Sequence, residues 1–185
     1  MRKALRRVGF DARQNFILIT AYEKRMIQIT QGLLDEVTAK AKSAARKRTH
    51  YNFHKNYDDT VQRLLNAAEP GTYIRPHKHE DPDKIEVFII LQGSVVVVEF
   101  DDAGAVTGHV VLSRERGVFG VEIPPRTWHT FITLEPGSVL YEVKEGPYRQ
   151  AVDKNFASWA PEEGSVEAPE FNKKVLRTLK MDPSF

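Results

Sequence analysis

The chain has 185 residues, of which 41% are hydrophobic and 28% charged, and its formal net charge is +2 at pH 7. This size and balance predict one globular domain with a hydrophobic core and a short appendage. Because the sequence contains no cysteine, it excludes disulfides, iron–sulfur clusters, zinc fingers and thiol nucleophiles. Any bound metal must be held by imidazole and carboxylate groups, which favours Zn, Fe, Mn, Ni or Co.

The beginning of the chain is strongly basic. Residues 1–48 contain twelve Lys or Arg against four Asp or Glu. Such a segment can contact nucleic acid or an anionic surface, but no recognition motif accompanies the charge. We therefore interpret it as a solvated helix face and expect no nucleic-acid partner. The apolar run at residues 16–19 is too short for a signal peptide or a membrane span, so we expect a cytoplasmic protein without membrane contact, in which residues 1–25 form a poorly defined extension.

A helix is predicted over residues 30–48, inside a helical N-terminal segment that covers residues 26–60. Apolar residues recur there at helical spacing, and Thr30 is suited to the N-cap position. The basic residues Arg46, Lys47 and Arg48 favour the C-terminal end of the helix dipole. This amphipathic helix is expected to pack on a sheet.

Residues 61–143 are short apolar runs separated by turn signals. The segments 85–91, 95–100, 106–112 and 130–134 are rich in β-branched and aromatic residues and predict strands, whereas 61–68 is ambiguous between helix and strand. This texture predicts a mainly β sandwich or barrel over residues 61–165, followed by a short helical or mobile tail at 166–185.

The segment 85–91 is apolar on both faces apart from Glu86. We expect it to be covered on both sides, by the helix over residues 30–48 or by a second subunit. A carboxylate buried in such a strand must be paired or coordinated, because an isolated buried charge is unfavourable.

Four residues have the identities and spacing of a metal site. His77 and His79 are two residues apart, so on a strand they point to the same face. Glu86 lies beyond an Asp-Pro-Asp turn, from which the returning strand can place it opposite the histidines, and His129 follows a Pro-Pro turn. Imidazole and carboxylate groups so arranged form an open metal site. We prefer Glu86, which belongs to a strand, over the acidic residues of the turn, Glu80, Asp81 and Asp83.

These residues resemble the first signature motif of the cupin superfamily. That motif is a glycine, five residues, His-x-His, three or four residues, Glu, six residues and a glycine. The sequence matches it from Gly71 to Gly93, but six residues separate His79 from Glu86.

The second cupin motif, a glycine, a proline turn and a histidine, matches at Gly117, Pro124 and His129, with Arg126 in place of the usual turn glycine. The resemblance implies a cupin double-stranded β-helix with an N-terminal helical extension. It also implies a homodimer and one divalent ion, Zn, Fe, Mn or Ni, held by His77, His79, Glu86 and His129.

A closer resemblance is to the WbuC-type cupin-fold metalloproteins. It covers about residues 26–165 and rests on residues 52–54, 58–66, 70–77, 141–148 and 159–163. That family is associated with bacterial surface-polysaccharide (O-antigen) gene clusters, and its reaction is unassigned. The likeness implies that residues 61–66 form a strand.

Three further residues are candidate catalytic groups. His54 can line the pocket as an acid–base group or be a structural histidine. Tyr73 can donate a proton or pack in the barrel wall. Arg75, two residues before His77, can clamp a carboxylate or phosphate, or form a surface ion pair.

The sequence therefore predicts a metal-dependent protein for a small sugar-like or carboxylate ligand, acting as an isomerase or epimerase. A non-enzymatic binding module and an iron-dependent oxygenase are the alternatives. The fold does not choose among them, because one scaffold hosts many chemistries, and no residue beyond the ligands is committed to acid–base work.

Overall fold

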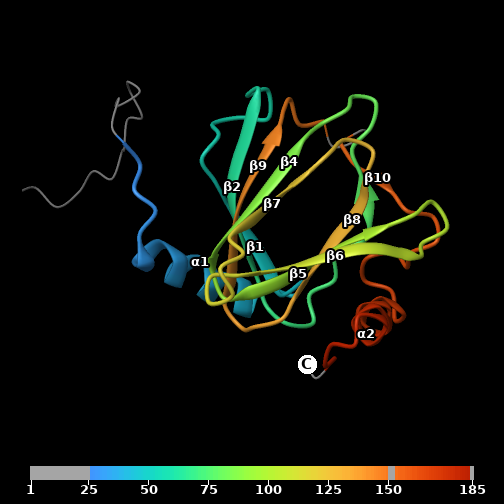
Figure 1. Ribbon diagram of the computed structural model, residues 1–185. Coiled ribbons are helices and arrows are strands. Elements are labelled where there is room, and N and C mark those ends of the chain that lie inside the picture. Colours follow the sequence, from blue (N-terminus) through green and yellow to red (C-terminus); the bar gives the residue numbers. More distant parts are fainter. Residues whose placement is uncertain (1–25, 150–152, 184–185) are drawn as a thin grey trace, which may run out of the picture.

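The computed structural model describes residues 26–149 and 153–183, so the expected extension at residues 1–25 lies outside it. Two five-stranded antiparallel sheets lie face to face (Figure 1). The first sheet has the order β1 (Arg48–Asn52), β2 (Val61–Ala68), β9 (Ser138–Glu145), β4 (Glu86–Gln92), β7 (Gly120–Ile123). The second has the order β10 (Asn155–Phe156), β3 (His77–Lys78), β8 (Trp128–Thr133), β5 (Ser94–Phe100), β6 (Val106–Ser113).

The hydrophobic core lies between the two sheets. Phe88, Ile90 and Leu140 from the first sheet pack with Val97 and Phe131 from the second. These residues alternate along their strands with residues of the outer faces, as the two-residue period of a strand requires. The predicted mainly β fold is confirmed, and residues 61–68, ambiguous by periodicity, form strand β2.

Helix α1 (Gln31–Ser43) covers the outer face of the first sheet. Its buried residues Leu34, Val37 and Ala41 pack against Leu65 and Val139, which point outward from β2 and β9. The hydroxyl of Thr30 accepts a hydrogen bond from the Leu33 amide, which confirms the predicted N-cap.

The prediction that this helix continues to residue 48 is wrong. Ala44 is extended, with φ −73° and ψ 140°, and Lys47 has a left-handed φ of 54°. Arg48 pairs with Ala68 in the first sheet, and its guanidinium donates to the Tyr73 carbonyl at 2.8 Å. Tertiary pairing has therefore overridden local helical spacing at this end.

Helix α2 (Ala168–Thr178) lies in the tail segment and packs on the second sheet. Val175 and Leu176 are buried with Val96, Val98 and Ile132, which point outward from β5 and β8. Neither helix of the described residues has the length and apolar character needed to cross a membrane.

Of the two covers expected for the outer face of β4, the helix does not reach Ile89, and the second subunit stays a prediction. Glu86, Phe88 and Ile90 are buried, but Ile89, on the other face, is 37% exposed. Helix α1 packs chiefly on β1, β2 and β9 and leaves this part of β4 open.

Candidate metal centre

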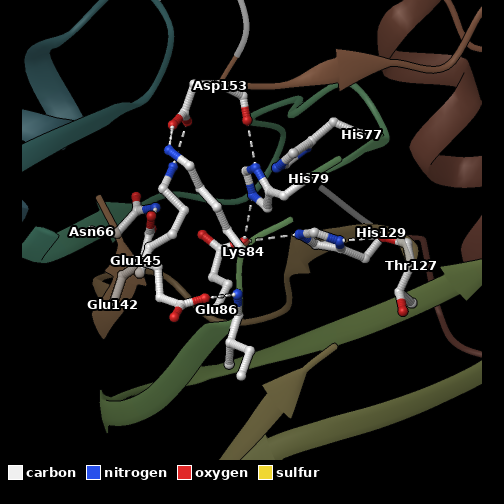
Figure 2. Close-up of polar contacts among 12 residues, drawn as sticks. Asn66, His77, His79, Lys84, Glu86, Thr127, His129, Glu142, Glu145 and Asp153 are labelled. Atoms are coloured by element: carbon white, nitrogen blue, oxygen red, sulfur yellow. Dashed lines mark hydrogen bonds and ion pairs between the residues drawn. The ribbon is translucent and has the colours of Figure 1, made fainter. Parts of the chain in front are cut away.

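The four predicted ligands meet between the sheets at one end of the barrel. His77 on β3 is directly opposite His129 on the neighbouring strand β8, and His79 follows two residues after His77. Glu86, the first residue of β4, reaches them from the facing sheet (Figure 2). Three ligands therefore come from one sheet and the fourth from the other.

The ligand atoms converge in a dry environment. One nitrogen or oxygen from each of the four side chains lies within 4.8 Å of the others, and all four residues are buried. Glu86 Oε2 is 3.1 Å from His79 Nε2 and 3.0 Å from His129 Nε2. This donor set, three imidazoles and one carboxylate, suits a divalent transition metal.

The other nitrogen of each imidazole contacts a backbone carbonyl. Nδ1 of His77 is 3.1 Å from the Arg75 carbonyl oxygen, Nδ1 of His79 is 2.5 Å from that of Asp153, and Nδ1 of His129 is 2.8 Å from that of Thr127. A carbonyl oxygen can only accept, so in a neutral ring the proton sits on Nδ1. The lone pair of each Nε2 then faces the cluster, as it does in metal-bound histidines.

With its proton on Nδ1, each ring offers the cluster no hydrogen-bond donor. The Nε2 lone pairs of His79 and His129 face the Glu86 carboxylate, which is also an acceptor, and the buried Nε2 of His77 has no hydrogen-bond partner. Buried acceptors without a donor are unfavourable. A cation among the four groups removes the conflict, so the residues fit a metal ion.

The protonation states of His77 and Glu86 at neutral pH also favour the binding of a cation. Burial, and next the charge of Lys154, hold the pKa of His77 well below its ordinary value. Burial by itself raises the pKa of Glu86, but contacts with His129 and His79 outweigh it and hold that pKa well below its ordinary value. A neutral imidazole and an ionised carboxylate are the forms that bind metals.

Asp153 connects the cluster to two buried lysines. Its carbonyl contacts His79, as described above, and its carboxylate accepts from Lys84 Nζ at 2.7 Å and Lys144 Nζ at 2.6 Å (Figure 2). Lys144 is opposite Glu86 in the sheet register. The second layer of the site is therefore ionic and tightly paired.

A cavity of about 530 Å³ lies next to the cluster. The four ligands do not line it, but residues that contact or neighbour them do, among them Glu142, Lys144, Asp153 and Phe156. Asn66 donates to Glu142 Oε2 at 2.9 Å. Burial, and next the nearby Glu86 carboxylate, raise the pKa of Glu142 to about 7.

Two of the three candidate catalytic residues line the cavity, and the third does not. His54 and Arg75 line the cavity. The Nδ1 of His54 accepts from the Arg63 amide at 3.1 Å, and Arg75 donates to the Ala157 carbonyl at 2.9 Å. Tyr73 is not among the lining residues: it is buried, its hydroxyl donates to the Pro161 carbonyl at 2.8 Å, and it packs against Phe171.

The acidic residues of the turn that follows His79 supply none of the ligands. Glu80 pairs with Lys78 at 2.9 Å, and Asp83 pairs with the exposed Arg126 at 2.9 Å. The carboxylate in the cluster is Glu86, despite the longer gap that precedes it.

Sequence reasoning missed three charged residues beside the cluster: Lys144, Asp153 and Lys154. Lys144 lies in strand β9 beside Glu142 and Glu145, so it does not stand out as an isolated charge in the way that Glu86 does in β4. No pattern distinguishes Asp153 and Lys154, which lie in an irregular segment and reach the site only through tertiary contacts.

Residues 29–112 match a family described as a domain of unknown function, DUF6016. No curated protein is similar enough in sequence to count as a relative. Similarity to solved structures is at the level of the fold. A structure of CapF with the inhibitor 3-isopropenyl-tropolone is 20% identical, with a TM-score of 0.50 over 62% of this chain and 32% of CapF.

Two smaller proteins are matched over most of their length. A protein of Klebsiella pneumoniae with a double-stranded β-helix domain is 16% identical, with a TM-score of 0.48 over 73% of this chain and 93% of that one. KdgF from a Halomonas species is 20% identical, with a TM-score of 0.43 over 56% and 82%. The chain spans only about a third of CapF, a match with a TM-score of 0.50. The two facing sheets, their strand order and this similarity identify the fold as the cupin double-stranded β-helix.

Proposed function

We propose that this protein binds one divalent transition metal through His77, His79, Glu86 and His129. The observation that carries the proposal is the convergence of three imidazole Nε2 atoms on a buried carboxylate, with each Nδ1 engaged by a carbonyl. With the three rings neutral and protonated on Nδ1, and without a cation, these groups present only lone pairs to one another. Zn, Fe, Mn and Ni all accept this donor set.

We further propose that the site acts on a small sugar-like or carboxylate ligand as an isomerase or epimerase, as in surface-polysaccharide metabolism. Four protein ligands leave room for one or two more donors on the ion, which when bound supplies Lewis-acid polarisation of a carbonyl or hydroxyl. The adjacent cavity has the volume of a small-molecule site. Its polar lining, which includes Glu142, His54 and Arg75, suits a hydroxylated ligand better than an apolar one.

A non-enzymatic binding module is the second candidate. It is favoured by His54 and Arg75, whose side chains are tied to backbone groups and are therefore suited to holding a ligand rather than transferring its protons. Incubation of the metal-loaded protein with aldoses and ketoses in D₂O separates the two functions. Conversion of one sugar into another, with or without solvent deuterium on carbon, supports the isomerase or epimerase, and saturable binding without conversion or exchange supports the binding module.

The metal itself is tested by elemental analysis of the purified protein. We expect about one equivalent of a transition metal in the wild type, and almost none in His77→Ala or His129→Ala. His109→Ala is the matched control, because His109 is exposed on β6, outside the cluster. Circular dichroism should show that all three variants remain folded. A folded wild type that binds no metal when supplied with Zn, Fe, Mn or Ni contradicts the proposal.

A further inference from the structure

The charges that line the cavity are not balanced. Five cations and three acids line it: Arg46, Arg48, Arg75, Lys144, Lys154, Glu142, Asp153 and Glu163. Two of the acids are already engaged by cations. Glu163 accepts from Arg48 at 2.6 Å and lies 3.3 Å from Arg46, and Asp153 is shared by Lys144 and the buried Lys84.

Among the five cations that line the cavity, Lys154 is the one that no acidic side chain in the described part of the chain engages in an ion pair. Within the described residues its ammonium makes no hydrogen bond and no ion pair, although it is half-buried in the cavity wall. Burial, and next the charge of Lys144, hold its pKa below the ordinary value. A half-buried ammonium without an acceptor is costly, so this position favours an anion.

Arg75 lines the same cavity as Lys154. Phe156 is opposite His77 in the sheet register and lines the cavity, as does Lys154, which lies just before β10. The Arg75 guanidinium lies 5.7 Å from the Phe156 ring centre. Its Nη1 is 3.9 Å from Glu162, a long contact to a side chain that is 84% exposed, which leaves this nitrogen open to another acceptor.

The surroundings of His50 reflect the same positive charges. His50 also lines the cavity. Partial removal from water, followed by the charges of Lys154, Arg48, Arg46 and Lys144, lowers its pKa to about 4. The histidine thus stays neutral at physiological pH, and the cavity remains electropositive through its Lys and Arg side chains.

We propose that Lys154 and Arg75 form an anion subsite that holds the carboxylate or phosphate of a sugar-sized ligand beside the metal cluster. The exposed ring of Phe156, which is 52% accessible, lies next to Arg75 and offers an apolar face to the carbon skeleton of the ligand. The volume of about 530 Å³ accommodates a monosaccharide derivative. This inference rests on the proposed function for the ion, but the anion subsite itself is built only from the chain.

The test is calorimetric titration of the metal-loaded protein with hexuronates and hexose phosphates, each beside its neutral hexose. We expect at least one anion to bind about tenfold to a hundredfold more tightly than its neutral counterpart, as a charge-assisted hydrogen bond allows. Lys154→Gln should abolish this preference, and Lys154→Arg should retain most of it. Lys174→Gln, which removes an exposed cation on α2, is the matched control and should behave as the wild type.

Carboxylate and phosphate are distinguished by which series shows the preference. Equal binding of anionic and neutral sugars, no binding of any anion, or an undiminished preference in Lys154→Gln overturns the subsite. Elemental analysis of the same samples separates this failure from that of the proposed function. A protein that carries no metal but prefers anions through Lys154 retains the subsite and overturns the metal proposal, and a metal-loaded protein without the preference does the reverse.

Discussion

Asp153 is a single residue on which several parts of the site depend. Its carboxylate is the shared acceptor for Lys84 and Lys144, and its carbonyl contacts the ring of His79. Removal of one member of a buried ionic group leaves the remaining charges uncompensated. This residue is therefore expected to contribute to stability and also to the orientation of a metal ligand.

Replacement of Asp153 by Asn should lower the free energy of unfolding by about 3 kcal/mol, because two buried ammonium groups lose their counter-charge. Burial by itself raises the pKa of Asp153, but Lys144 and Lys84 outweigh it and hold that pKa below its ordinary value. The charge therefore stabilises the protein above about pH 4, and this contribution is lost as the pH falls through the lowered pKa. Urea unfolding of both proteins at pH 7 and pH 3 measures the effect; a difference that is small at pH 7 contradicts the prediction.

Substitution of Tyr73 tests whether this residue has a catalytic or a structural role. Burial raises the pKa of its phenol to about 12, and the hydroxyl donates to the Pro161 carbonyl. We expect Tyr73→Phe to lower the free energy of unfolding by about 1 kcal/mol, because one hydrogen bond is lost, without a change in metal content or ligand affinity. A large loss of ligand turnover in a variant of normal stability would instead restore Tyr73 as a catalytic group.

At the scale of elements, α1 holds the outer face of the first sheet through a few apolar contacts. Leu34 is 7% exposed and packs in the cluster with Leu65 and Val139. Because a truncated side chain there leaves a cavity, Leu34→Ala should lower the free energy of unfolding by about 2–3 kcal/mol. Lys42→Ala, an exposed substitution on the same helix, should change it by less than about 0.5 kcal/mol. Chemical denaturation measures both, and equal effects would mean that the helix does not pack as described.

Elements also show where sequence patterns suffice. The N-cap at Thr30 and the strand at residues 85–91 follow from local residue preferences, and the structure contains both. The C-terminal end of α1 does not follow from local preferences. Arg48 pairs with Ala68 in the sheet, and its side chain contacts the Tyr73 carbonyl and Glu163, so tertiary contacts replace another helical turn. The open face of β4 likewise depends on where α1 lies, which no local pattern encodes.

For the whole molecule, the core and the metal cluster are separate. The core residues Phe88, Val97, Phe131 and Leu140 come from both sheets, and none is a ligand. We therefore expect the fold to survive metal removal. Chelation should lower the melting temperature of the Zn-loaded wild type by about 5–10 °C, because a ligand that binds only the native state stabilises it.

His77→Ala provides the control for this measurement, and its melting temperature should not respond to chelator. Scanning calorimetry with and without EDTA, combined with circular dichroism at 25 °C, measures both quantities. Complete unfolding of the chelated wild type at 25 °C, or an equal shift in the variant, would show that the ion is not held by this cluster or that the core depends on it.

The sequence by itself was enough to predict the mainly β fold and the four residues of the cluster. Strand periodicity places His77 and His79 on one face, and an isolated Glu86 in an apolar strand requires a partner. The tertiary structure alone decided that Tyr73 is packed against α2, that Asp153 bridges two lysines, and that Lys154 and Arg75 line one cavity. These facts depend on which distant segments meet, because burial and charge pairing are set by packing between the sheets rather than by spacing along the chain.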